Sequence, residues 1–209
     1  MATLLFRGVA FAQIPVEVFS GHKKATVDIM FFKNIKNNKG HNSKFLFFNR
    51  NRASVEYHMT ETTNMPQFGF TEAFSYNHEK LKGFAPVVVA SILNRGVYPK
   101  AGIQFAKVKK DYTIFSWVVA ETLKEPNVDF FFLARYTPKL TDKLNLFSQI
   151  EFVNAFPSVE KNNFAFTQRL RLGLKITAFQ FGAGLDLTQF GRNDFTQTEN
   201  LGGFLRYEF

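Results

Sequence analysis

The sequence predicts an all-β protein: a transmembrane antiparallel up-and-down β-barrel of about twelve strands, with ten strands as the alternative. Three observations lead to this prediction. Apolar and polar residues alternate in twos along most of the chain, and no helical period persists. Phenylalanine accounts for 28 of the 209 residues, more rings than a soluble domain of this size can readily bury. The longest uncharged apolar stretch, 83–94, is too short for a membrane-spanning helix, so only a closed barrel could place these rings in a bilayer.

Composition also excludes several classes of protein. The chain has no cysteine, which removes disulfide scaffolds, thiolate zinc sites and cysteine nucleophiles. The net charge of +9 raises nucleic-acid binding as a class. The aromatic residues, however, recur in every predicted strand and on one face, so we expect no nucleic-acid partner. No calcium loop, phosphate-binding loop or dinucleotide fingerprint is present, and we expect no cofactor and no metal.

The first residues resemble the end of an export signal. Ala10 and Ala12 form the small-residue pair that precedes a signal-peptidase cut, although Arg7 interrupts the apolar stretch before them. We therefore expect residues 1–12 to be the remnant of an export signal and residues 13–209 to form a single β-barrel domain. The sequence leaves open whether 14–20 is the first strand or a plug.

The strands are predicted from the period of two. In chain order, the alternation is clearest in 26–31, 52–58, 128–136, 144–152, 164–175 and 177–187. In 164–175, Phe and Leu occupy most even positions, whereas Arg169, Arg171 and Lys175 occupy odd ones. Wide, uniform apolar faces of this kind suit lipid better than a shared core, so we expect them to face the membrane and the polar faces to line a lumen.

Eleven groups of turn-forming residues separate the predicted strands. They lie at 22–24, 37–43, 60–66, 79–83, 95–96, 109–111, 123–126, 137–142, 157–162, near 176, and at 190–198. Eleven breaks give twelve strands if 14–20 is counted, and an even number is usual for a single-chain bacterial barrel.

The last strand carries a resemblance to a known family. The chain ends in LGGFLRYEF, with Leu205, Tyr207 and Phe209 on one face. This pattern resembles the closing-strand signal of Gram-negative outer-membrane β-barrel proteins, although it identifies no subfamily. The resemblance implies a location in the cell outer membrane, lipid around the barrel, and an assembly machinery that reads Leu205, Tyr207 and Phe209.

The polar faces supply the candidate lumen-lining and solute-binding residues. These are Arg50, Arg52, Glu56, Asp129, Arg135, Glu151, Arg169, Arg171, Asp186 and Arg206. We also expect Glu72 to point into the barrel. The predicted positive and negative charges inside nearly balance, so the lumen is expected to be near neutral. Arg169 and Arg171 lie on one face and could bind a carboxylate or phosphate. Without a ligand, we expect them to pair with Glu151 and Asp186 on the neighbouring strands.

These observations predict a monomeric, narrow, passive porin-like channel for small polar solutes, and not an enzyme. The alternative is a non-conducting accessory barrel, packed with paired charges, that docks a partner through its loops. The third possibility is a barrel hydrolase centred on His58, which shares a face with Glu56. The sequence names no solute.

Overall fold

The computed structural model describes residues 14–58, 66–94, 96–123, 127–160 and 162–209. The predicted export signal at 1–12 lies outside these residues. Twelve strands are present: β1 (Pro15–Gly21), β2 (Lys24–Lys36), β3 (Asn42–Glu56), β4 (Gln67–Tyr76), β5 (Phe84–Leu93), β6 (Gly96–Val108), β7 (Tyr112–Glu121), β8 (Val128–Tyr136), β9 (Asn145–Phe156), β10 (Phe164–Ile176), β11 (Phe179–Gly191) and β12 (Phe195–Glu208). The predicted count of twelve is confirmed, and the segment at 14–20 contributes the first strand.

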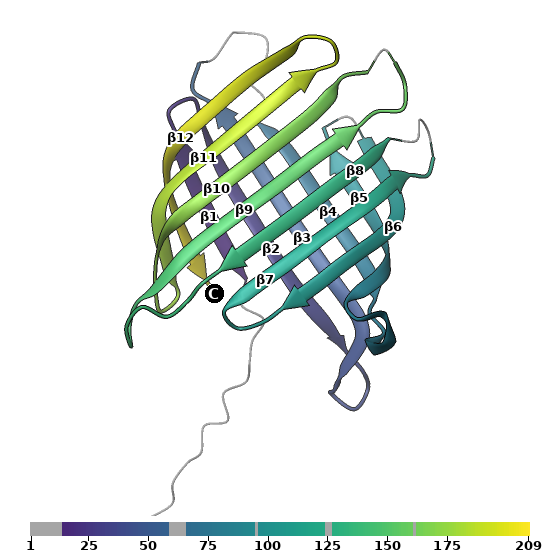
Figure 1. Ribbon diagram of the computed structural model, residues 1–209, viewed down its shortest axis with the longest axis vertical. Helices are drawn as coiled ribbons and strands as arrows, with labels where there is room; N and C mark the ends of the chain where they lie inside the picture. The colour runs from purple at the N-terminus through teal and green to yellow at the C-terminus, as the bar shows by residue number, and fades with distance from the viewer. Residues whose placement is uncertain (1–13, 59–65, 95, 124–126, 161) are drawn as a thin grey trace, which may run out of the picture.

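The strands form a closed ring. Each pairs antiparallel with its neighbours in the chain, and β1 also pairs with β12, from Pro15 opposite Glu208 to Gly21 opposite Gly202. Figure 1 shows the tilted strands winding around one axis, with the C-terminus at the lower rim. We call this lower end the terminal rim and the opposite end the outer rim. In the part of the chain described, no helix is long and apolar enough to cross a membrane.

The outer wall is apolar, as the alternation predicts. Val88 on β5 and Ile103 on β6 are 59% and 61% exposed, and similar residues recur on the other strands. Two aromatic pairs lie near the terminal rim, where Tyr76 contacts Phe45 at 5.4 Å between ring centroids and Tyr207 contacts Phe179 at 4.7 Å. Apolar side chains in the middle with aromatic rings near an edge are what a lipid-facing wall requires.

Among the described residues, the turns lie where the sequence placed them, with one marked difference. The 190–198 region was expected to be a loop, but β11 continues to Gly191 and β12 begins at Phe195. Its polar residues extend the strand ladder instead, with Gln189 Nε2 donating to Gln197 Oε1 at 3.2 Å. Turn-forming residue types therefore do not prevent β11 and β12 from pairing beyond the apolar part of the wall. At the other end, the β2–β3 hairpin projects past the terminal rim (Figure 1).

Candidate functional site in the barrel lumen

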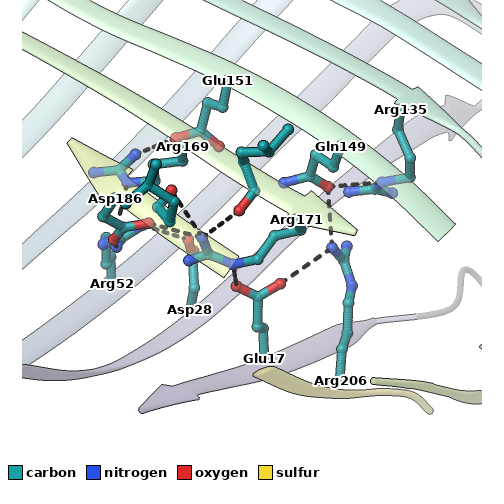
Figure 2. Close-up of polar contacts among 12 residues, drawn as sticks. Glu17, Asp28, Arg52, Arg135, Gln149, Glu151, Arg169, Arg171, Asp186 and Arg206 are labelled. Carbon is teal, nitrogen blue, oxygen red and sulfur yellow. Dashed lines mark hydrogen bonds and ion pairs between the residues drawn. The ribbon is translucent and has the colours of Figure 1, made fainter. Parts of the chain in front are cut away.

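One half of the lumen holds a network of buried charges (Figure 2). Four carboxylates point into it, from Glu17 on β1, Asp28 on β2, Glu151 on β9 and Asp186 on β11. Each is ion-paired with at least two guanidinium groups. Those groups belong to Arg50, Arg52, Arg169, Arg171 and Arg206. Charges this deeply buried are tolerated because each has opposite charges within reach.

Two of the ion pairs cross the lumen. Arg50 Nη1 on β3 donates to Glu151 Oε1 on β9 at 2.8 Å, and β9 lies diametrically opposite β3 in the ring of twelve. Arg52 Nη2 donates to Asp186 Oδ2 on β11 at 2.9 Å. Arg50 also pairs with Asp28 on the adjacent strand, through Nε at 3.1 Å and through Nη2. These side chains obstruct the barrel axis and tie its walls together.

Arg171 is the most completely enclosed of the arginines, with 2% of its side chain exposed. Its Nε donates to Glu17 Oε1 at 3.0 Å and its Nη1 to Asp186 Oδ1 at 2.8 Å, while Cζ lies 4.0 Å from the centre of the Phe19 ring. Gly184 makes room for it, because a Cβ there would lie 2.8 Å from Arg171 Cδ. Arg171 on β10 therefore links β11 and the more distant β1, and it has little capacity left for a solute.

A second pair of arginines shares one neutral acceptor. Gln149 Oε1 accepts hydrogen bonds from Arg135 Nε at 2.9 Å and from Arg206 Nη1 at 3.2 Å. Both guanidinium groups lie against the Phe147 ring, at 5.9 and 5.6 Å from its centroid. Glu17 lies 3.7 Å from Arg206. This arrangement brings two like charges together with the help of an amide and an aromatic face.

The other half of the lumen is filled by aromatic rings. Phe48 on β3 stacks on Phe115 of β7 at 5.2 Å, and also contacts Trp117 at 5.2 Å and Phe131 of β8 at 6.0 Å. Phe32 contacts Phe115 from β2 at 4.8 Å. The same cluster includes Met30, Ala73, Val87, Val89, Val119 and Leu133. Together with the ion pairs, these rings fill the interior of the barrel.

A cavity of about 270 Å³ opens above the charged half, at the outer rim. Three of its lining residues are cationic, Lys24, Arg52 and Arg169, and Asp186 is its acidic lining residue. Its remaining walls are formed by Ser54, Gln67, Phe68, Gly69, Thr167 and Thr188. We call this cavity the vestibule. Its floor includes the Arg52–Asp186 pair that crosses the lumen.

The structure places the candidate residues on the lumen side, with one at the edge. Arg50, Arg52, Asp129, Arg135, Glu151, Arg169, Arg171, Asp186 and Arg206 point inward. Asp129 stands apart from the network and pairs with Lys100 on β6. Glu56 is exposed at the end of β3. As expected, Arg169 and Arg171 pair with Glu151 and Asp186. Solute binding by any of these residues stays a prediction.

The expectation for Glu72 was wrong. Glu72 lies on the outer face of β4, with the exposed rings of Phe70 and Phe74, whereas its neighbours Ala73 and Ser75 are buried inside the barrel. Glu72 and those two rings occupy every second position of β4 and therefore lie on the same face. Its charge alone suggested the lumen.

Sequence reasoning missed the aromatic half of the lumen and several polar members of the network. The signal for the rings was present in runs of adjacent apolar residues, such as Phe130, Phe131 and Phe132, which cannot all face lipid from one strand. Glu17 was also missed, because a single polar residue in a short strand shows no pattern, and Lys24 was missed because it fell in the turn predicted at 22–24.

The remaining predicted sites lie outside the lumen. Leu205 is exposed on the outer face of β12, and the Tyr207 ring contacts Phe209 at 4.6 Å. Their recognition by an assembly machinery stays a prediction. His58 lies beyond the end of β3 and is exposed. Among the described residues, no group of three or more His, Asp or Glu side chains could hold a metal ion.

Comparison with known proteins identifies the fold. No protein family and no curated protein sequence matches the chain. The solved structure of the NanC porin is similar over 95% of this chain and 100% of its own, with 7% identity and a TM-score of 0.51. The KdgM porin aligns over 94% of this chain and 99% of its own, with 11% identity and a TM-score of 0.49; its complex with disordered oligogalacturonate aligns over the same shares at 10% identity, also with a TM-score of 0.49.

The class predicted from the sequence is confirmed. The closed ring of twelve strands, the apolar outer wall and the fold shared with the NanC porin are those of a Gram-negative outer-membrane β-barrel. The chain thus has the closed ring and the apolar outer wall of a membrane-embedded barrel.

Proposed function

We propose that this barrel is a narrow, passive, porin-like channel for small polar solutes, that it favours anions, and that it rests with its lumen filled. The observation that carries the proposal is the vestibule. It opens at the outer rim, and three cations and one carboxylate line it. A small anion entering from outside meets Lys24, Arg52 and Arg169 before it reaches the obstructed part of the lumen.

The vestibule floor suggests how such a solute would advance. Arg52 and Arg169 bind Asp186 at 2.9 and 3.8 Å, and an entering carboxylate or phosphate presents the same kind of oxygen acceptors. The solute can therefore replace Asp186 as their partner and loosen the Arg52–Asp186 bridge across the lumen. Passage then requires rearrangement of side chains, while the strands keep their hydrogen bonds. Selection by charge and size at such a constriction follows from ordinary electrostatics.

The filled lumen favours a second candidate, a non-conducting accessory barrel. The aromatic cluster and the ion pairs satisfy one another without any solute. A barrel stabilised in this way could serve as a rigid support that docks a partner through its loops. The two candidates differ in whether current passes.

The test is ion selectivity of the refolded protein in planar bilayers. Under a salt gradient, we expect a reversal potential that indicates preference for anions. The Arg52→Ala/Arg169→Ala variant should lose most of that preference, because it removes two of the vestibule cations. The matched control, Lys110→Ala/Lys109→Ala, removes the same charge from the turn at the terminal rim and should keep it.

Inserted wild-type protein that passes no current would reject the channel and support the accessory barrel. Equal selectivity in both double variants would reject the vestibule as the selective element.

A further inference from the structure

A polar cluster interrupts the apolar outer wall. It consists of Asn49 and Asn51 on β3 and Glu72 on β4. Asn49 lies directly opposite Glu72 in the strand register, and its amide donates to Glu72 Oε1. Asn51 Nδ2 donates to Asn49 Oδ1 at 3.3 Å.

All three side chains lie on the outside of the barrel. On β3, Phe48 and Arg50 point into the lumen, so the residues that alternate with them, Asn49 and Asn51, point outward. On β4, Ala73 belongs to the interior cluster, which places Glu72 on the opposite face. The three residues therefore belong to the wall that faces lipid.

The cluster also lies near the middle of the membrane-facing span. On the outer face of β4, Glu72 is midway between Phe68, at the outer end of the strand, and Tyr76, at the terminal end. Tyr76 packs against Phe45, and together they mark the aromatic edge near the terminal rim. A carboxyl group at this depth is costly unless other polar groups surround it.

The barrel itself does not supply enough partners. Within the described residues, the hydrogen bond to the Glu72 carboxyl comes from Asn49. The side-chain oxygen of Asn51 is buried and has no hydrogen-bond partner. Lipid tails offer neither donors nor acceptors, so these groups remain unsatisfied in a barrel surrounded by lipid alone.

We propose that the outer wall at β3 and β4 is a contact between two copies of this chain, related by a two-fold axis that passes through the polar cluster. The occupant is a second copy because the cluster is complementary to itself. Asn51 and Glu72, which are both partly exposed, offer amide N–H donors and carboxylate oxygen acceptors, respectively. A two-fold axis brings the donors of each copy to the acceptors of the other.

The residues around the cluster permit close approach. Ala90 on β5 lies directly opposite Glu72, and Ala53 follows Asn51 on the outer face of β3. Small residues beside polar ones allow two backbones in a membrane to come close enough for hydrogen bonds. The proposed dimer differs from the monomer expected from the sequence. It does not depend on channel function, because each barrel keeps its own lumen.

Crosslinking tests the position of the contact, and the absence of native cysteine leaves a single engineered thiol as the reactive group. The full chain is refolded in liposomes as Ala90→Cys or as Ala183→Cys, which is exposed on the outer face of β11, far around the ring. With a flexible bis-maleimide crosslinker, which bridges thiols that lie on either side of the axis, we expect a crosslinked dimer from Ala90→Cys and little from Ala183→Cys. Equal yields from the two variants would overturn the proposed contact.

Sedimentation equilibrium in density-matched detergent tests the role of the polar side chains. We expect dimers of the wild type, and a dissociation constant raised about tenfold or more in the Asn49→Leu/Asn51→Leu/Glu72→Leu variant, since a few membrane hydrogen bonds account for that factor. Leucine suits a lipid-facing wall, so the variant should fold, which its heat-dependent gel mobility verifies. Gln168→Leu, on the outer face of β10 and away from the cluster, is the matched control and should dimerise as the wild type does.

A wild type that stays monomeric at every concentration would overturn the proposal, even if it co-purified with another membrane protein. A triple-leucine variant that dimerises like the wild type would also overturn it.

Discussion

At the scale of single residues, the packing of the interior depends on arginines whose N–H groups mostly donate to buried carboxylates. Arg171 binds Glu17 and Asp186 and lies on the Phe19 ring. Its pairing with Asp186 could be predicted from the sequence, because the two residues occupy polar positions on adjacent strands. Its pairing with Glu17 could not, since β1 meets this region only after the ring closes. Long-range partners depend on the register around the whole barrel.

We expect Arg171→Ala to lower the free energy of unfolding by about 3–5 kcal/mol, because it removes a buried guanidinium partner from two buried carboxylates at once. Urea unfolding in liposomes, followed by the fluorescence of the single tryptophan in the lumen, measures this change. Lys139→Ala is the control. It removes an exposed ion pair with Asp142 and should change the unfolding free energy by less than about 1 kcal/mol. Similar effects from the two variants would contradict the role given to Arg171.

At the scale of single strands, the period of two predicted both the existence of each strand and, in most cases, its faces. β10 is the clearest example, because its outer positions are nearly all apolar and three of its inner ones are basic. The period failed in two ways. At Phe131, which shares its parity with the inward Asp129 and Arg135, it indicated the face but not that rings would fill that part of the lumen. Where a charge shares the apolar face, as Glu72 does, the residue type suggested the wrong side.

We expect Leu172→Arg to cost about 2–4 kcal/mol of folding free energy in lipid, since it places a cation on the lipid-facing side of β10. Leu140→Arg is closely matched, because the two leucines are 54% and 53% exposed, but Leu140 lies in the turn between β8 and β9. Folding titrations in liposomes compare the two. An equal effect would place Leu172 outside the membrane and disprove the register of β10.

At the scale of the whole molecule, the barrel differs from a soluble protein in exposing apolar side chains and burying charged ones. Its outer wall is apolar, and its interior is divided between a charged half and an aromatic half. The sequence predicted the wall because the wall repeats from strand to strand. It could not predict the division of the interior, which exists only when strands distant in sequence, such as β3 and β9, face each other.

We expect Phe48→Ala to both destabilise the barrel and raise its conductance, because the ring is fully surrounded and contacts strands on the far wall. The loss should be about 3–5 kcal/mol, as for other buried aromatic residues. Phe74→Ala, which removes a ring on the lipid-facing side of β4, should have a smaller effect on stability and none on conductance. Bilayer recordings and urea titrations of both variants give the comparison. Unchanged conductance in Phe48→Ala would mean that the aromatic cluster does not limit passage.

The ion pairs between Arg50 and Glu151 and between Arg52 and Asp186 affect how fast the lumen can open. They are side-chain contacts between walls whose backbones are fully paired around the ring. Opening them requires rotations about side-chain bonds and no displacement of a strand. Such rotations move only a few atoms and are rapid compared with domain motions, which take on the order of microseconds to milliseconds. A barrel that opens in this way flickers faster than an electrical recording can resolve, so its current should be a small, steady average with excess high-frequency noise.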